Sequence, residues 1–164
     1  MLSTTSAILS AKEKVYIVTP YFIPVETVLN AIKQVALSGL DVRLMVPRSG
    51  DSVIVNAAAY SYYEELLENN VRIFFYKKGF IHAKTMVIDD NFSCVGTANM
   101  DVRSQELNFE VNTLIFDKEV NQKLQNIFLG DIDDCDEIIL NEWKKRPKHK
   151  VFFEHLARLL SPLI

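Results

Sequence analysis

Apolar and polar positions follow two periods along most of the chain, and the two alternate in a way that predicts strands separated by helices. Residues 15–20 (VYIVTP) and 41–47 (DVRLMVP) are runs rich in β-branched residues that end at proline, as strands do. Residues 25–37 are apolar at positions 25, 28, 29, 32, 35 and 36, which is helical spacing. Gly39 can end that helix.

The same two periods predict the other elements. They indicate three further helices: one over 3–11, one from Asp51 or Ser52 to about Asn69 that Asn70 ends, and one from Asp117 to about Ile132. They also indicate a strand over 71–76, a hairpin of strands 82–88 and 92–96, and a strand over 107–116. Strands separated by helices predict an α/β sandwich with a partly parallel sheet. The hairpin makes that sheet mixed.

The pattern changes at Asn141, so we divide the chain into a domain, residues 1–140, and a tail, residues 141–164. The tail begins with the basic stretch WKKRPKHK and continues with the amphipathic, strongly apolar stretch VFFEHLARLLSPLI. Such a segment either lies on an anionic lipid surface or packs on the domain as a helix.

Composition narrows the class of protein. A chain of 164 residues that is 49% hydrophobic suits one domain with a substantial core. Its net charge of −3 argues against a general nucleic-acid-binding protein. Cys94 and Cys135 are too few for a metal site and suit a reducing compartment. There is no apolar run of the roughly 18–20 residues that a membrane-spanning helix needs, and the N-terminus does not resemble a signal peptide.

The stretch IHAKTMVIDDNFSCVGTANMD, residues 81–101, carries the candidate chemistry. In a strand, His82 and Lys84 point to the same face because side chains alternate. Gly96, Thr97 and Asn99 end the next strand, where small residues let a ligand approach closely. A histidine, a lysine, a hydroxyl and an amide at one place match the needs of a phosphate group. Glu110, in a neighbouring strand, could hold the Nδ1 proton of the histidine.

These residues carry a family resemblance. His82, Lys84 and Asp89 spell HxKxxxxD, and GTANMDVRS follows, which resembles the HKD motif of the phospholipase D superfamily. Nearly the whole chain is similar to the C-terminal half of the bacterial cardiolipin synthases. Thr97 stands where that family usually carries serine, and the family's membrane segments and first HKD half have no counterpart here. We therefore expect a fragment of a longer protein with a phospholipase D-like α/β/α sandwich.

The resemblance implies a reaction without metal or cofactor. One histidine attacks the phosphodiester and becomes a phosphohistidine, while a second protonates the leaving alkoxide and later activates the acceptor. In cardiolipin synthesis both lipids are phosphatidylglycerol, and glycerol leaves. The second histidine must come from another HKD half, in the same full-length chain or through a homodimer. The full-length protein would lie at the cytoplasmic face of the cell membrane, whereas this fragment alone should be soluble.

The resemblance also implies roles for single residues. His82 is nucleophile or acid/base, and Glu110 orients it. Lys84, Thr97 and Asn99 bind phosphate oxygens. Asp89 belongs to the motif's catalytic set, although we expect it to hold the turn. A further group, Asp101, Arg103 and Ser104, is expected to brace the loop.

Two other functions remain compatible with the sequence. A phosphodiesterase of the same superfamily could act on nucleic acid as a homodimer with one motif per chain, although the acidic composition speaks against a nucleic-acid partner. A half-domain without catalytic activity could bind lipid or complete a partner's site. The intact set of motif residues argues against this second alternative.

Overall fold

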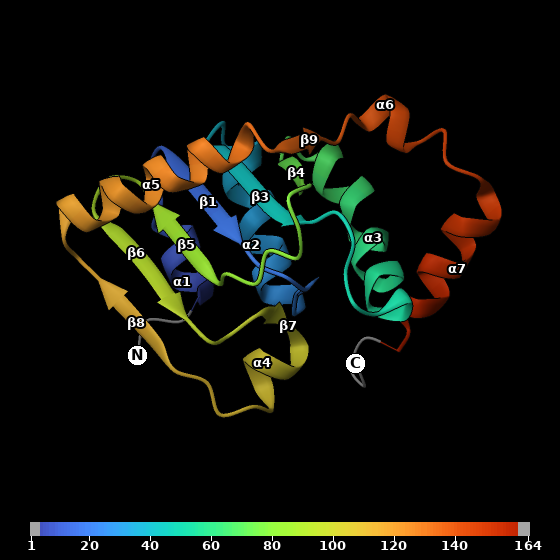
Figure 1. The fold of residues 1–164 in the computed structure, drawn as a ribbon, viewed down its shortest axis with the longest axis horizontal. Coiled ribbons are helices and arrows are strands. Elements are labelled where there is room, and N and C mark those ends of the chain that lie inside the picture. Colours follow the sequence, from blue (N-terminus) through green and yellow to red (C-terminus); the bar gives the residue numbers. More distant parts are fainter. Residues whose placement is uncertain (1–3, 161–164) are drawn as a thin grey trace.

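A computed structural model of the protein describes residues 4–160 and shows a central sheet between two layers of helices (Figure 1). Within these residues the sheet has seven strands in the order β8-β6-β5-β1-β3-β4-β9. Their bounds are β1 Lys14–Val18, β3 Asp41–Pro47, β4 Arg72–Tyr76, β5 Thr85–Ile88, β6 Phe92–Gly96, β8 Asn112–Ile115 and β9 Cys135–Glu137. Strands β1, β3 and β4 run parallel, and the other pairs are antiparallel. The predicted mixed sheet is confirmed.

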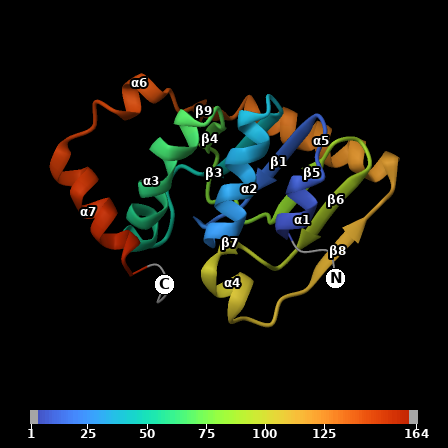
Figure 2. The same ribbon diagram turned by 180° about the vertical axis from the view of Figure 1, so that it is seen from behind.

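Helices cover both faces of the sheet, as Figures 1 and 2 show from opposite sides. Helix α5 (Lys118–Ile132) crosses one face and contacts β1, β4, β5 and β9. Helices α1 (Thr4–Leu9), α2 (Glu26–Leu37) and α3 (Val53–Glu68) form the layer on the other face. The predicted α/β/α sandwich is therefore confirmed.

The core lies on both sides of the sheet because successive strand residues face opposite layers. Tyr16 in β1 points to the α5 side, where its ring stacks on Phe128 with the centroids 4.8 Å apart. Its neighbour Ile17 belongs to the larger cluster beneath α2 and α3, together with Leu44 and Ile73.

The helix ends follow the sequence signals. The Ser52 hydroxyl accepts a hydrogen bond from the Val55 N–H at 3.4 Å and caps α3, and the Asp117 carboxylate caps α5 through Val120 at 2.9 Å. Gly39 (φ 92°) and Asn70 (φ 66°) adopt the left-handed conformation just after α2 and α3.

Two predicted strands are too long. Strand β5 begins at Thr85, so His82 and Lys84 lie in the segment that leads into it. Strand β8 covers only 112–115 of the predicted 107–116. The Asp101 carboxylate accepts a hydrogen bond from the Ser104 N–H at 2.7 Å and starts a short helix, α4 (Val102–Glu106). The N–H groups of Leu107 and Asn108 then bond to the Arg103 carbonyl at the end of this helix, so these two residues do not pair in β8.

The sequence pattern missed several very short strands. Strand β7 (Met100–Asp101) pairs in parallel with β2 (Phe22–Ile23), forming a second, two-stranded sheet. Strand β9 pairs with β4 and forms one edge of the seven-stranded sheet. Strands of two or three residues are too short to show a period.

The tail forms helices α6 (Leu140–Trp143) and α7 (Lys148–Arg158), and α7 lies along α3. Trp143 packs among the rings of Tyr60, Tyr63 and Phe75, so it anchors the tail on the domain. Across residues 4–160, no helix combines the length and hydropathy needed to cross a membrane.

Candidate active site

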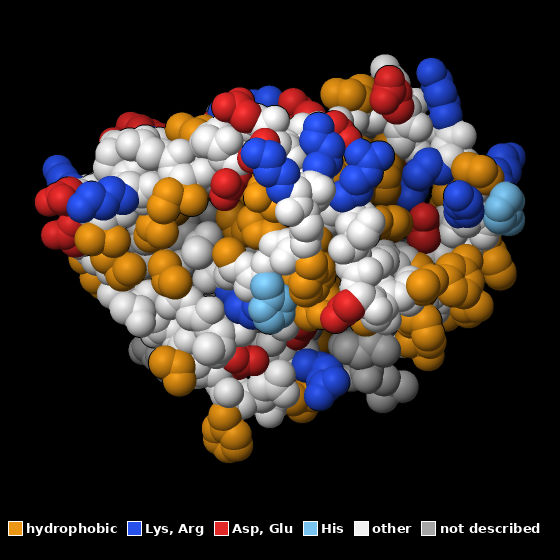
Figure 3. All heavy atoms as spheres, viewed as in Figure 1, with side chains coloured by type: hydrophobic (Ala, Val, Ile, Leu, Met, Phe, Trp, Pro, Cys, Tyr) orange, Lys and Arg blue, Asp and Glu red, His pale blue; other side chains and the backbone are white. Residues whose placement is uncertain are grey.

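The candidate site lies at one end of the β5–β6 hairpin, where loops meet on the front face of the molecule. Figure 3 shows a histidine near the centre of this face with basic and acidic side chains close by. The exposed His82 ring contacts Phe80 (centroids 5.5 Å apart) and meets the Tyr21 ring edge-on at 6.4 Å. No described residue forms a hydrogen bond with its imidazole. Both ring nitrogens are therefore open to a ligand or to a partner domain.

Lys84 is held next to this histidine. Its Nζ donates a hydrogen bond to the His82 carbonyl oxygen at 2.8 Å, and its own carbonyl accepts one from the Gly96 N–H at 3.2 Å. Partial burial lowers the pKa of Lys84, while the nearby Glu110 and Asp101 carboxylates oppose that shift. The ammonium carries three donors, so it has donors left for an anion.

Thr97 and Glu110 form the second part of the site. The Thr97 N–H donates to the Val111 carbonyl at 2.9 Å, and the Val111 N–H donates to the Thr97 hydroxyl oxygen at 3.0 Å. The Thr97 hydroxyl donates in turn to the Glu110 carboxylate, which also accepts from Asn108 at 3.3 Å. The hydrogen bond from Thr97 is the main reason why the pKa of Glu110 is lowered.

The expected hydrogen bond between Glu110 and His82 is absent from this structure. Glu110 lies just before β8 rather than within a strand, and the reciprocal bonds between Thr97 and Val111 direct its carboxylate to Thr97. An orienting role for Glu110 on a histidine therefore stays a prediction.

Asn99 borders two hollows. It lines a small cavity of about 40 Å³ together with Lys84, and it also lines a larger pocket. Its Oδ1 atom is buried and makes no hydrogen bond within the described part of the chain. A buried polar atom without a partner is costly, so this amide is a good candidate for contact with a ligand.

Asp89 is not part of this cluster. It follows β5 at the opposite end from His82, with φ at 49°, and its carboxylate accepts hydrogen bonds from the backbone N–H groups of Lys12, Glu13 and Lys14 at 2.8–3.2 Å. The carboxylate therefore fixes the chain that enters β1. A direct catalytic role for Asp89 stays a prediction.

The structure requires glycine at position 96 for a different reason from the expected one. A Cβ atom at this position would overlap the Asn112 side chain and the Val111 carbonyl oxygen. The missing Cβ atom therefore makes room for β8 and the chain before it to approach β6, rather than for a ligand to approach.

A pocket beside this cluster is hardly indicated by the sequence pattern. It has a volume of about 380 Å³, and its walls include Tyr21, Asp51, Arg103 and Asn108. For Asp51 the sequence suggests only the role of a helix cap, which Ser52 takes in the structure. For Arg103 it suggests only that the side chain braces the loop. Position is the signal that could have found the pocket, because Asp51 closely follows the C-terminal end of the parallel strand β3, where sites of α/β sheets occur.

Metal ligands do not gather in the described residues: no cluster of three or more His, Cys, Asp or Glu side chains could hold an ion there. Cys94 and Cys135 are both free thiols. Burial raises the pKa of Cys135 to about 11, which makes it a poor nucleophile.

Solved structures share this fold. The chain superposes with a TM-score of 0.72 on Nuc from Salmonella typhimurium, a phospholipase D family member, at 17% identity over 82% of this chain and 88% of the other. Phosphatidylserine synthase from Haemophilus influenzae gives a TM-score of 0.74 at 18% identity, over 98% of this chain and 44% of the other.

Sequence relatives are more similar. The chain is 44% identical over 157 residues to cardiolipin synthase 2 from Bacillus anthracis and 47% identical over 155 residues to cardiolipin synthase from Listeria monocytogenes. These alignments cover 96% and 94% of this chain but only 30% and 32% of the relatives, so the chain spans about a third of their length. The family model described as cardiolipin synthase, PLD-like domain, matches residues 4–132. The chain therefore belongs to the PLD-like domain family of the cardiolipin synthases.

Proposed function

We propose that the chain is one catalytic half of a phosphatidyltransferase that joins two phosphatidylglycerol molecules into cardiolipin and releases glycerol. The observation that carries the proposal is the meeting of His82, Lys84, Thr97 and Asn99 at one end of the β5–β6 hairpin, in a chain 44–47% identical to cardiolipin synthases. That set offers a nucleophile or acid, a fixed positive charge and an amide to one phosphodiester, and Thr97 lies beside them.

In the first step, a histidine nitrogen attacks phosphorus, the bond between phosphorus and the glycerol oxygen breaks, and a second histidine gives that oxygen its proton. In the second step, the second histidine takes the proton of the acceptor hydroxyl. The acceptor oxygen then attacks phosphorus, and the phosphorus–nitrogen bond breaks. The imidazole of His82 is exposed and makes no hydrogen bond to a residue in the described part of the chain, which suits either role.

Lys84 and Asn99 would stabilise the charge that builds on the non-bridging oxygens. Lys84 is prepared for this because its bond to the His82 carbonyl fixes the ammonium beside the reacting group. The hydroxyl of Thr97 is already used as a donor to Glu110, so its contribution would be to hold that carboxylate near the phosphate site.

A single imidazole cannot serve both sides of an in-line displacement, because nucleophile and leaving group lie on opposite sides of phosphorus. The second histidine would come from another HKD half, in a longer chain or in a second copy. The open front face around His82 is where that half would sit.

The test is His82→Ala in an assembled two-half enzyme, with cardiolipin formed from phosphatidylglycerol as the readout. We expect exchange to be abolished while the thermal unfolding temperature is unchanged, because the His82 side chain is exposed and makes no hydrogen bond to a described residue. The control is Lys118→Ala, an exposed side chain at the start of α5, away from both His82 and α7. Normal turnover by the His82 variant would refute the assignment. Cleavage of plasmid DNA that disappears in the variant would instead favour a nucleic-acid phosphodiesterase.

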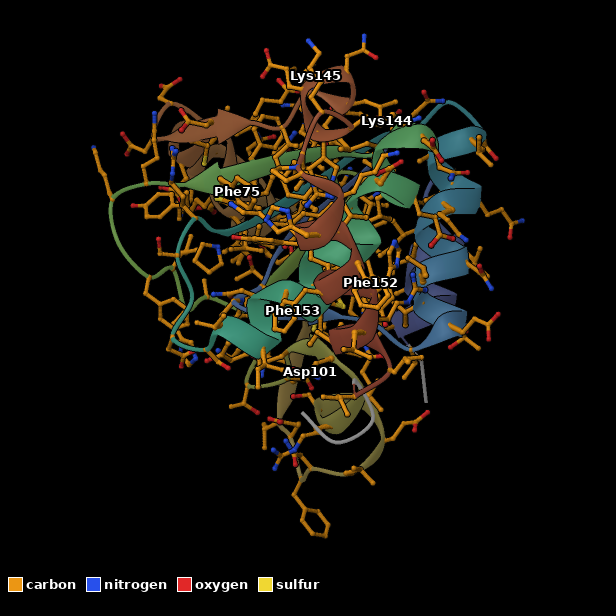
Figure 4. All side chains as sticks on the ribbon, turned by 90° about the vertical axis from the view of Figure 1, so that its right-hand side faces the viewer. Phe75, Asp101, Lys144, Lys145, Phe152 and Phe153 are labelled. Carbon is orange, nitrogen blue, oxygen red and sulfur yellow. The ribbon has the colours of Figure 1, made fainter. Side chains whose placement is uncertain are left out.

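We also propose that α7 rests on an anionic membrane surface at the cytoplasmic face. The helix packs on the domain through Glu154 and Ala157, which are buried, and exposes an apolar stripe on its other side. Figure 4 shows Phe152 and Phe153 on the outer side of the helix. The stripe consists of Phe152, Phe153, Leu156, Leu159 and Leu160, of which Phe152 is 71% and Leu159 75% exposed.

Basic side chains flank this stripe and favour lipid over another protein as the occupant. Exposed lysines at 144, 145, 148 and 150 lie before and within the first turn of α7. Figure 3 shows the apolar patch over α7 with basic groups beside it. Each basic residue near an anionic surface contributes about 1 kcal/mol, which adds to the burial of the phenylalanines.

Co-sedimentation with vesicles tests this contact. We expect binding to phosphatidylglycerol vesicles that falls with salt, weakens in Lys145→Gln/Lys148→Gln, and is weak on neutral phosphatidylcholine. Lys118→Gln is the control, because this exposed lysine starts α5 at the other end of the molecule (Figure 1). Equal binding to both lipids would refute the electrostatic contact, and concentration-dependent dimers that Phe152→Ser removes would show that the stripe binds another copy.

A further inference from the structure

The pocket of about 380 Å³ beside His82 is separate from the Lys84 cavity but shares Asn99 with it. Tyr21 forms part of its wall, and the Tyr21 ring also meets His82 edge-on at 6.4 Å. The pocket is therefore adjacent both to the reacting histidine and to the residues proposed to bind phosphate.

Polar groups in the pocket are held in place but still have hydrogen-bonding and ion-pairing capacity for a ligand. The Tyr21 hydroxyl donates to the Asp51 carboxylate at 2.7 Å, and Asp51 has no ion pair with any described lysine or arginine. Burial and this hydrogen bond raise the pKa of Tyr21 to about 12, so the hydroxyl keeps its proton and fixes the carboxylate. The exposed guanidinium of Arg103, on another part of the wall, likewise lacks an ion pair within residues 4–160, and the buried Oδ1 of Asn99 has no partner among them.

The charged and apolar side chains that line the pocket suit one chemical class of ligand, a small neutral polyol. The Asp101 carboxylate is buried and already caps α4 through the Ser104 N–H, so the free charges of the pocket are one carboxylate, Asp51, and one guanidinium, Arg103. One free charge of each sign favours neither a second anion nor a cationic amine. Apolar walls come from Ile23 and Val55 among mostly polar neighbours, and a volume near the lower end of the roughly 300–1,000 Å³ range for ligand sites suits a small headgroup rather than an acyl chain.

We propose that this pocket binds the glycerol headgroup of the lipid whose phosphate lies at Lys84, with the Asp51 carboxylate accepting hydrogen bonds from the headgroup hydroxyls. A carboxylate with free lone pairs can accept from two neighbouring hydroxyl groups, and Arg103 and Asn108 can donate to their oxygens. The inference rests on the proposed function, because it places the phosphate at Lys84. It adds the residues that would distinguish a polyol headgroup from an amino alcohol.

Binding to the intact chain tests the pocket without requiring turnover. Amide NMR titrations would compare sn-glycerol 1-phosphate, O-phosphoethanolamine and inorganic phosphate. We expect glycerol phosphate to bind roughly tenfold more tightly than inorganic phosphate, which corresponds to one hydrogen bond to a charged group. Asp51→Asn should remove most of this preference while leaving the affinity for inorganic phosphate unchanged. Glu119→Gln, an exposed carboxylate on α5, is the control and should change neither value.

Loss of the pocket and loss of the phosphate site give different results. Lys84→Ala should weaken all three ligands. If it does so while Asp51→Asn leaves the preference for glycerol phosphate intact, the pocket assignment is wrong and the phosphate site stands. Tighter binding of phosphoethanolamine than of glycerol phosphate also overturns the pocket assignment. If Lys84→Ala has no effect on inorganic phosphate, the proposed phosphate site itself is wrong, and the inference fails with it.

Discussion

Asp89 stabilises the entry to β1 through backbone N–H groups more than 70 positions earlier in the chain. Asp89→Asn keeps a side chain that tolerates the left-handed backbone but loses the negative charge. Because hydrogen bonds to charged groups contribute about 1.5–3 kcal/mol, we expect the free energy of unfolding to fall by roughly that amount. Urea unfolding measures it.

The matched control for Asp89 is its neighbour. Asp90→Asn removes only a surface ion pair with Lys14, so we expect a loss of less than about 1 kcal/mol. Equal effects of the two substitutions would mean that Asp89 does not hold this turn. Loss of phosphatidyl transfer in Asp89→Asn without loss of stability would support a catalytic role for Asp89.

The pKa of the Glu110 carboxyl should depend on the residue at position 97. Thr97 lowers the pKa of this carboxyl by donating a hydrogen bond to its charged form. Thr97→Val keeps the shape but removes the donor, so the pKa should rise toward the ordinary value of 4.5. Thr97→Ser should keep it low. NMR titration of the Glu110 carboxyl carbon distinguishes these outcomes.

The sign of the linked effect on stability follows from the direction of this shift. A carboxyl whose folded pKa is below its unfolded value stabilises the fold above the unfolded pKa, and the contribution disappears as pH falls through the folded value. The wild-type protein should therefore lose this contribution only below about pH 4.5, and in Thr97→Val the contribution should be smaller. An unchanged pKa in the valine variant would mean that Thr97 is not the cause.

At the scale of elements, one buried ion pair joins α7 to the turn after α6. Arg146 donates to both carboxylate oxygens of Glu154 at 2.8 Å and lies over the Trp143 ring at 3.5 Å. The Arg146 side chain is only 17% exposed and that of Glu154 only 8%. Burial raises the pKa of Glu154 even though Arg146 opposes the shift, so the pair does not fully offset its desolvation.

This balance predicts opposite outcomes for one and two substitutions. Arg146→Ala leaves a buried carboxylate without a partner and should lower the free energy of unfolding by about 3–5 kcal/mol. Arg146→Met/Glu154→Leu should be close to neutral, because an apolar pair needs no compensation there. Urea unfolding of both variants measures the difference. A double variant as unstable as the single one would show that the ion pair itself holds α7 in place.

At the scale of the whole molecule, the site around His82 is half of what an in-line exchange needs. We expect phosphatidyl transfer only from assemblies that contain two HKD halves. Light scattering over a concentration series, with transfer assayed on the same samples, measures this: activity should follow the assembled fraction, and added complementary half should raise it. A fully active monomer of the chain would contradict the two-histidine mechanism.

The sequence by itself determined the parts of the molecule that depend on neighbours in the chain. Strand and helix periods, the caps at Ser52 and Asp117, and the left-handed residues Gly39 and Asn70 are local features, and their predictions are confirmed. The HKD motif and the GTAN segment that follows it are also local patterns, and these residues alone are specific enough to indicate the family.

Only the tertiary structure decided which distant residues meet. Asp89 reaches the backbone of residues 12–14, Glu110 bonds to Thr97 instead of His82, and Tyr21 meets Asp51, 30 positions away, to shape the pocket. The same is true of α7, whose buried and exposed sides depend on how it lies along α3. Period and motif describe a few successive residues, whereas these contacts depend on sheet order and loop geometry, which bring together residues far apart in the chain.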